Sequence, residues 1–253
     1  MKVIEKRLIM VTGGSRGIGA DIVERIARRG FPVCFSYISR QREADSLVQR
    51  LTQDGCEVAS IRSDVSDPSD IDRFFSFAKE QFGQLGGFVN NAGFVGKAGR
   101  QIKDLDEATL RKCFDVNAIG PIICSQRALK QLSLASGGAG GRIVSVSSIA
   151  ARTGSPNDWV DYAASKAALN TFILGFGKEV AADGVQVIGI GPGGVATELH
   201  TQAGSPERLE RFCEITPIGR PAASTEIADA VVWALLDAPD YLTATTIELS
   251  GGL

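Results

Sequence analysis

The nine residues VTGGSRGIG, at positions 11–19, decide how the rest of the chain is interpreted. They follow an apolar run and precede an amphipathic stretch, residues 19–30. Gly13, Gly17 and Gly19 would let the backbone approach a ligand closely, and the N-terminus of a following helix attracts phosphate. The stretch therefore predicts a nucleotide-binding turn between a first strand and a first helix, although a plain tight turn would also explain the glycines.

Outward from this turn, strand-like and helix-like segments alternate to the end of the chain. Such alternation implies an α/β fold with a parallel sheet covered by helices on both faces. No linker or repeat interrupts it, so residues 1–253 are predicted to form a single domain. The long unpatterned stretch at about 193–223 is expected to be a lid or a disordered loop. The predicted strands are 7–14, 31–38, 57–65, 86–93, 141–148, 185–194 and 245–252, and the predicted helices are 19–30, 42–55, 67–83, 106–135, 159–184 and 224–237.

Composition excludes several classes of protein. Hydrophobic residues make up 44% of the 253 and the formal charge is −2, so neither disorder nor a nucleic-acid partner is indicated. No apolar run approaches the roughly 20 residues that cross a bilayer, and the charged N-terminus does not resemble a signal peptide. A single histidine, His200, leaves no multi-histidine metal site. The five cysteines are dispersed, which predicts reduced thiols in a cytoplasmic protein and no zinc site. The cysteines are Cys34, Cys56, Cys113, Cys124 and Cys213.

The glycine turn also matches the nucleophile elbow of hydrolases. Gly13 to Gly17 read G-x-S-x-G, which would make Ser15 a nucleophile with His200 as its base. That elbow normally follows several strands, whereas only one strand is predicted before residue 13. The hydrolase interpretation is therefore disfavoured.

The end of the second predicted strand bears on the choice of cofactor. An acidic residue there would hydrogen-bond the ribose 2′-hydroxyl of NAD, but none precedes Glu43. Ser36, Ser39 and Arg40, together with Arg16, could instead hold a 2′-phosphate, because arginine donates two parallel hydrogen bonds to phosphate. The sequence predicts NADP(H), and the alternative is that the arginines are solvated surface charges.

Tyr162 and Lys166 stand four residues apart on a predicted helix and so share one face of it. A nearby ammonium lowers the pKa of a phenol, which would let the tyrosine act as an acid or base. Ser147 and Ser148 lie at the end of the fifth predicted strand, where α/β ligand sites form. Neighbouring strand side chains point to opposite faces, so only one of the two serines can serve.

Together these segments resemble the short-chain dehydrogenase/reductase family nearly from end to end, most closely its bacterial 3-oxoacyl-carrier-protein reductase-like and sugar-dehydrogenase-like members. The resemblance implies a Rossmann-like, doubly wound sheet of seven strands. The matching motifs are TGGSRGIG (12–19), Asp64-Val65, NNAG (90–93), Asn117, the serine pair (147–148), YAASK (162–166) and GPGGVAT (191–197).

The resemblance also implies a catalytic tetrad of Asn117, Ser148, Tyr162 and Lys166. Tyr162 would protonate the carbonyl oxygen, Lys166 would lower the tyrosine pKa and hold the nicotinamide ribose, Ser148 would orient the carbonyl, and Asn117 would hold a water. Ser147 stays the weaker alternative to Ser148. The implied cofactor-binding residues are Gly13, Ser15, Arg16, Gly17, Ile18, Gly19, Ser36, Ser39, Arg40, Asp64, Val65, Asn91, Ala92, Gly93, Tyr162, Lys166, Pro192, Gly193, Val195 and Thr197.

The expected function is NADP(H)-dependent hydride transfer between nicotinamide and a small-molecule carbonyl or secondary alcohol. A non-catalytic NADP-binding sensor or scaffold is the alternative. Residues 196–220 are expected to cover the substrate, with His200 either a surface residue or a substrate contact. Relatives pair the helices matching 106–135 and 158–182, so a homotetramer or homodimer is implied, and many relatives have glycine at Ala244. The substrate itself would be selected by the lid and by Phe94, Val95, Arg152, Thr153, Asn157 and Trp159.

Overall fold

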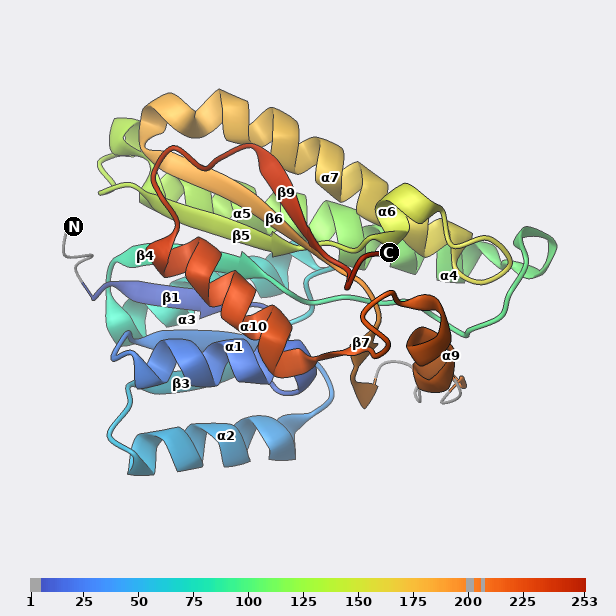
Figure 1. Cartoon of the computed structure of the whole chain (residues 1–253). Helices are drawn as coiled ribbons and strands as arrows, with labels where there is room; N and C mark the ends of the chain where they lie inside the picture. Colours follow the sequence, from blue (N-terminus) through green and yellow to red (C-terminus); the bar gives the residue numbers. More distant parts are fainter. Residues whose placement is uncertain (1–5, 199–202, 206–207) are drawn as a thin grey trace.

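The computed structural model describes residues 6–198, 203–205 and 208–253. Seven strands form one parallel sheet in the order β3-β2-β1-β4-β5-β6-β9, which confirms the predicted architecture (Figure 1). The chain builds outward from β1 to β3 and then restarts at β4 on the other side of β1. The strands are β1 (Leu8–Val11), β2 (Val33–Tyr37), β3 (Val58–Arg62), β4 (Leu85–Asn90), β5 (Gly141–Val146), β6 (Val185–Pro192) and β9 (Thr245–Leu249).

Helices cover both faces of the sheet because alternate strand residues point to opposite sides. In β1, Ile9 and Val11 join one hydrophobic cluster, and Leu8 and Met10 join the other. The first cluster lies under α1, α2 and α10, of which α1 and α10 are seen in front of the sheet in Figure 1, and the second lies under α3, α5 and α7. Their bounds are α1 (Gly17–Arg28), α2 (Gln41–Gln53), α3 (Pro68–Phe82), α5 (Gly120–Leu132), α7 (Val160–Val180) and α10 (Ser224–Val232).

Most predicted strands run two or three residues past the observed carboxyl ends. The strand β5, for example, ends at Val146, so Ser147 and Ser148 lie in the turn beyond it. The residues after β1 and β4 likewise leave the sheet as loops. These loops converge at one edge of the sheet, where ligands bind in open α/β folds.

The predicted helix 106–135 is interrupted in the structure. It consists of α4 (Glu107–Phe114), a π-helical turn η2 (Asp115–Ile119) and α5, which ends at Leu132. Gly120 follows the turn and lies so close to the chain after β3 that an added Cβ would come 2.5 Å from the Val65 carbonyl oxygen. Single π-turns inside helices recur at functional sites. Asn117 lies within this one.

The stretch 193–223 is predicted to be a lid or a disordered loop, and the part of it that the structure describes holds short regular elements. It contains the short strands β7 (Val195–Ala196) and β8 (Ala222–Ala223), which pair in parallel, and α9 (Arg208–Ile215). In Figure 1, α9 lies to the side of the carboxyl ends of the strands. His200 lies outside the described residues.

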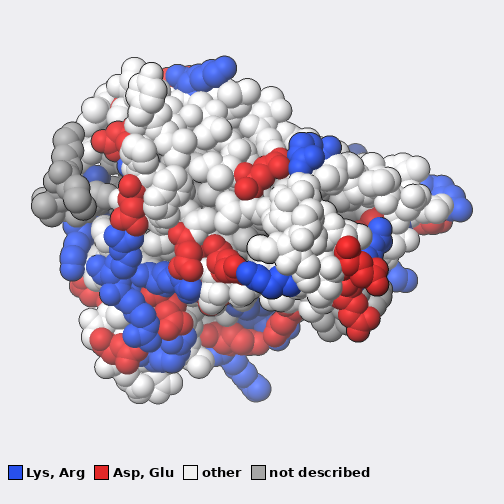
Figure 2. Space-filling view, viewed as in Figure 1, with Lys and Arg blue, Asp and Glu red and all other residues white. Residues whose placement is uncertain are grey.

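Charged side chains of both signs gather over α1 and α2 in the view of Figure 2, whereas the area over α7 carries few. Among the described residues, no helix combines the length and apolar character needed to cross a membrane.

Candidate active site

A cavity of about 1060 Å³ opens at the carboxyl ends of the central strands. The side chains of Asp64 and Asn117 are not part of its wall. The other predicted site residues all line it, and they are Gly13, Ser15, Arg16, Gly17, Ile18, Gly19, Ser36, Ser39, Arg40, Val65, Asn91, Ala92, Gly93, Ser148, Tyr162, Lys166, Pro192, Gly193, Val195 and Thr197.

The glycine turn is held against the loop that follows β4. Gly13 has φ +68°, a conformation that favours glycine, and a Cβ there would come 3.0 Å from the Ala92 Cα. The side-chain amide of Asn91 donates hydrogen bonds to the Thr12 and Gly13 carbonyls at 2.9 and 3.0 Å. The helix α1 starts at Gly17, and Arg16 before it makes no side-chain cap. The first amide groups of α1 are therefore left without a side-chain acceptor beside the cavity, as phosphate recognition requires.

Arg16 and Arg40 lie at one end of the cavity, and both face Glu198, an acidic residue to which the sequence assigned no role. The Glu198 carboxylate lies 3.6 Å from Arg16 Nη1 and 3.7 Å from Arg40 Nη2. Arg40 also pairs with Glu43 at 2.8 Å. Ser36 is buried, and its hydroxyl accepts a hydrogen bond from the Gly13 amide at 3.4 Å. This end of the cavity therefore holds two guanidinium groups whose charges are balanced by Glu43 and by Glu198 at the start of the lid.

The Asp64 side chain makes hydrogen bonds within its own turn. Its carboxylate accepts hydrogen bonds from the Ser66 amide at 2.9 Å and the Ser66 hydroxyl at 2.7 Å. Val65, the next residue, lines the cavity in its place.

Tyr162 and Lys166 reach the cavity from the first turns of α7. Lys166 Nζ donates to the Val146 carbonyl at 2.8 Å and lies 5.8 Å from the centroid of the Tyr162 ring. The Ser148 hydroxyl interacts with the phenol and favours its ionised form. The neighbouring Ser147 hydroxyl instead donates to Asn170 Oδ1 at 2.6 Å. Of the two serines, Ser148 is thus the one directed to the tyrosine.

Burial controls the ionisation of this pair. It raises the pKa of Tyr162 to about 12, against the opposing effect of Ser148. It also lowers the pKa of Lys166 to about 8. Desolvation of the phenol outweighs the effect of Ser148 here, and the lowering of the tyrosine pKa by Lys166 stays a prediction.

Asn117 is fully buried and its amide is engaged by protein groups. It donates to the Phe94 carbonyl at 2.7 Å and accepts from the Phe94 amide at 2.9 Å, and it also donates to Ser165 Oγ at 3.2 Å. The side chain therefore fastens the loop after β4 to α7, and it does not itself face the cavity.

A family model described as short chain dehydrogenase matches residues 7–208. This chain belongs to the short-chain dehydrogenase family. It is 36% identical over 245 residues to the uncharacterized oxidoreductase YgfF of Escherichia coli (strain K12), covering 97% of this chain and 99% of that one. It is 29% identical to the 3-oxoacyl-[acyl-carrier-protein] reductase FabG of Staphylococcus aureus (strain Mu50 / ATCC 700699), covering 96% of each. A short chain dehydrogenase from Burkholderia cenocepacia J2315, solved in complex with NADP, has a TM-score of 0.89 and 28% identity, covering 98% of both chains.

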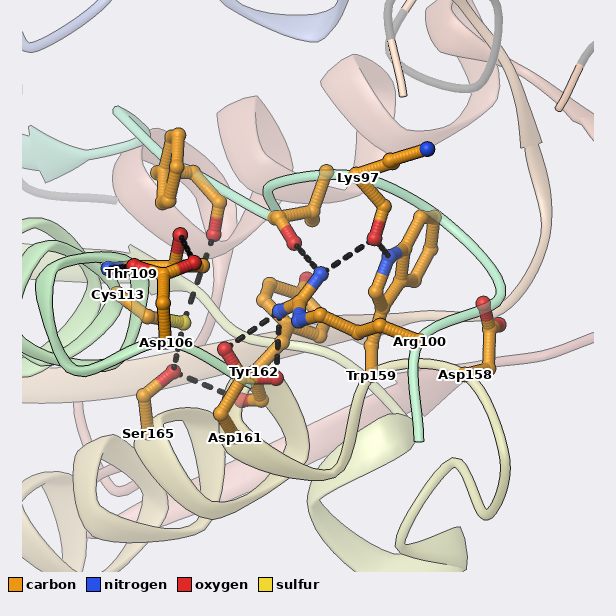
Figure 3. Close-up of polar contacts among 12 residues, drawn as sticks. Lys97, Arg100, Asp106, Thr109, Cys113, Asp158, Trp159, Asp161, Tyr162 and Ser165 are labelled. Carbon is orange, nitrogen blue, oxygen red and sulfur yellow. Dashed lines mark hydrogen bonds and ion pairs between the residues drawn. The ribbon is translucent and has the colours of Figure 1, made fainter. Parts of the chain in front are cut away.

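In this short-chain dehydrogenase, a network that the sequence reasoning missed stiffens the wall beside the tyrosine (Figure 3). Arg100 forms a buried ion pair with Asp161, the residue before Tyr162, and donates to the Val95 carbonyl at 2.8 Å. Trp159 Nε1 donates to the Lys97 carbonyl at 3.3 Å. These contacts bind the loop after β4 to the start of α7. No local pattern could have paired residues that stand 61 positions apart.

The wall beyond Tyr162 is largely apolar. The Trp159 ring meets the Tyr162 ring edge-on, with centroids 6.1 Å apart. Of the residues expected to select the substrate, Arg152 and Asn157 do not line the cavity, and Arg152 pairs with Glu248 at 3.0 Å instead. Other residues that line the cavity are Phe94, Val95, Thr153, Leu209, Phe212 and Ile215, with Arg208 over the Trp159 ring.

Proposed function

We propose that this chain is an NADP(H)-dependent oxidoreductase that transfers a hydride between nicotinamide and a carbonyl or secondary-alcohol carbon. The observation that carries the proposal is that the Tyr162–Ser148 pair and Lys166 open into the same cavity as the glycine turn. A phenol placed with a serine hydroxyl and an ammonium beside a nucleotide-binding turn suits proton transfer, which a sensor or scaffold does not need. The complex of the Burkholderia cenocepacia relative with NADP supports the choice of cofactor.

The residues present fit a phosphorylated dinucleotide. The close packing of Gly13 on Ala92 leaves the backbone open to the cavity, and α1 begins without a side-chain cap. Arg16 and Arg40 would hold the 2′-phosphate, since both line the cavity and a carboxylate already attracts them. Gly93, Pro192, Gly193 and Thr197 would lie along the nicotinamide half. When bound, the cofactor supplies or accepts the hydride.

In reduction, Tyr162 would donate its hydroxyl proton to the carbonyl oxygen as negative charge develops there. The Ser148 hydroxyl would hold that oxygen in place. The Lys166 ammonium, which is largely protonated at neutral pH with a pKa of about 8, would stabilise the tyrosinate that remains. A proton from solvent would then restore the phenol. Asn117 would act by holding the Phe94 loop rather than by touching the substrate.

The Tyr162→Phe substitution tests the assignment. We expect it to lower NADPH-dependent reduction of aldehydes and ketones by about a hundredfold or more, with NADPH binding retained in a fluorescence titration. Ser148→Ala should lose turnover as well, whereas Ser147→Ala should keep most of it. Undiminished turnover in Tyr162→Phe would refute the assigned proton donor. A wild-type protein that binds NADPH but reduces no carbonyl compound would favour the sensor.

We also propose a cellular location and an oligomeric state for this enzyme. The free cysteines support a cytoplasmic location, and the exposed apolar side chains of α5 and α7 support a homodimer or homotetramer.

A further inference from the structure

The substrate end of the cavity contains a guanidinium group among its aromatic residues. Arg208, the first residue of α9, has its Cζ 4.0 Å from the Trp159 ring centroid and 5.6 Å from that of Phe212. Arginine stacked on aromatic faces is held in a defined orientation. Trp159 in turn contacts Tyr162, so the guanidinium and the predicted proton donor share one aromatic neighbour.

Only part of the hydrogen-bonding capacity of Arg208 is used. Nη1 donates to Asp158, and the two side chains are 16% and 15% exposed. Nε is buried and has no partner, and Nη2 makes no hydrogen bond to any residue in the described ranges 6–198, 203–205 and 208–253. The buried Nε carries a desolvation cost, whereas Nη2 is not among the buried atoms and is open to a further acceptor.

The Asp158 carboxylate is held by a second hydrogen bond, so it fixes the position of Arg208. Its other carboxylate oxygen accepts the Gly99 amide at 3.0 Å. Figure 3 shows Asp158 next to Trp159 at the entrance to α7, beside the loop that carries Lys97. The guanidinium is thus anchored by one nitrogen and stacked on one ring, with the outer nitrogen left over.

The charges around this end favour an anion. Lys112 and Arg211 line the cavity together with Arg208. The acidic side chains that line it, within the described part of the chain, are Asp158 and Glu198, and each already faces arginine. A negatively charged group bound here would therefore meet a surplus of positive charge.

We propose that the substrate carries a carboxylate that binds Arg208 Nη2 while its carbon framework packs on Trp159. The enzyme would then act on oxo acids or hydroxy acids, with the reacting carbonyl at Tyr162 and the carboxylate under α9. This inference rests on the proposed function. Charge-assisted hydrogen bonds of this kind distinguish an acid from its ester strongly.

The test compares 4-formylbenzoate with its methyl ester, which differ in charge and not in the reacting aldehyde. With NADPH, the wild-type enzyme is expected to show the higher kcat/KM for the acid. Arg208→Met keeps an apolar side chain against Trp159 but removes the charge. It should lower kcat/KM for the acid by roughly tenfold to a hundredfold, mainly through KM, and leave the ester within about twofold. Arg152→Met is the matched control, since that arginine does not line the cavity.

A merely structural role for Arg208, as a latch for α9, predicts equal losses for acid and ester, and that result would overturn the inference. So would a wild-type enzyme that prefers the ester or treats both alike, a measurement that does not depend on any variant folding. In each of those cases, turnover of the ester leaves the proposed function intact. If the wild type binds NADPH and reduces neither aldehyde, the inference fails, and the proposed function is then decided by its own test on other aldehydes and ketones.

Discussion

At the scale of single residues, the ionisable groups of α7 show how strongly burial changes side-chain chemistry. The spacing of Tyr162 and Lys166 predicts neighbours, and the structure makes them neighbours. Spacing cannot predict the solvent exposure of the pair, and here desolvation shifts both pKa values toward the neutral forms.

Lys166 should make stability depend on pH in a defined window. Burial lowers its pKa from the usual 10.5 to about 8, so the folded protein releases the proton before the unfolded chain does. Its contribution to stability is present above pH 10.5 and is lost as the pH falls through 8. Between pH 7 and 10, the free energy of unfolding of the wild type should rise by about 2 kcal/mol relative to Lys166→Met. Urea unfolding of both proteins measures this, and a constant difference would show that Lys166 is not desolvated.

Tyr162 acts in the opposite direction at higher pH. Its raised pKa means that the unfolded chain ionises first, so stability is present below pH 10 and is lost as the pH rises toward 12. The measurement on Lys166 should therefore stop at pH 10.

Glu198 should weaken NADPH binding in the wild type. Its exposed carboxylate faces Arg16 and Arg40, where we place the 2′-phosphate, so the phosphate must displace it. Glu198→Gln keeps the shape and removes the charge. We expect it to bind NADPH up to about fivefold more tightly and to leave NADH unchanged, since exposed ion pairs are weak. Fluorescence titration measures both, with the remote exposed Glu107→Gln as control, and an equal gain for NADH would place the phosphate elsewhere.

At the scale of elements, the contact between α7 and the chain before β9 depends on two small residues. Ala244 has φ +54°, a left-handed conformation that is unfavourable for alanine, while its amide donates to the Val187 carbonyl at 2.8 Å. A Cβ on Gly177 would come 2.7 Å from the Ala244 Cα. The glycine lets the helix approach, and the alanine adopts a strained conformation.

These two positions predict changes of opposite sign. Gly177→Ala should lower the free energy of unfolding by about 1 to 3 kcal/mol, because the helix must move away from residue 244. Ala244→Gly should raise it by about 1 kcal/mol or less, since relief of the left-handed strain exceeds the added chain entropy. Urea denaturation of each variant provides the test. If Gly177→Ala were neutral, α7 would not pack closely against residue 244.

At the scale of the whole molecule, apolar side chains remain exposed on the layer formed by α4, η2, α5 and α7. Phe172 and Phe176 stack with ring centroids 4.9 Å apart and pack against the buried core, whereas Leu174, between them in the sequence, is exposed. Figure 2 shows few charges over α7, in contrast to the crowded charges over α1 and α2. Such a surface is typical of an interface between copies. The exposed large apolar residues of α4, η2, α5 and α7 are Leu110, Ile119, Ile122, Val160 and Leu174.

Leu174→Arg should weaken the predicted assembly. A two-fold axis along α7 would bring two copies of residue 174 into one interface, so the dimer dissociation constant should rise by about a hundredfold or more. Light scattering after size-exclusion chromatography measures the mass, and retained NADPH binding shows that the variant is folded. Ile102→Arg, which changes an exposed apolar residue before α4, is the comparison. A wild-type protein that is monomeric by light scattering would contradict the predicted oligomer.

The sequence by itself determined the order of the strands and helices, the glycine turn and the pairing of Tyr162 with Lys166. These features follow from the order and spacing of residues along the chain, which can be read without knowing the tertiary contacts. Only the tertiary structure decided that Ser148 rather than Ser147 meets the tyrosine, that Asn117 holds a loop, and that burial sets the two pKa values. The pairs Arg100–Asp161, Arg208–Asp158 and Glu198 with its two arginines join distant segments, and such contacts exist only once the sheet has brought those segments to one edge.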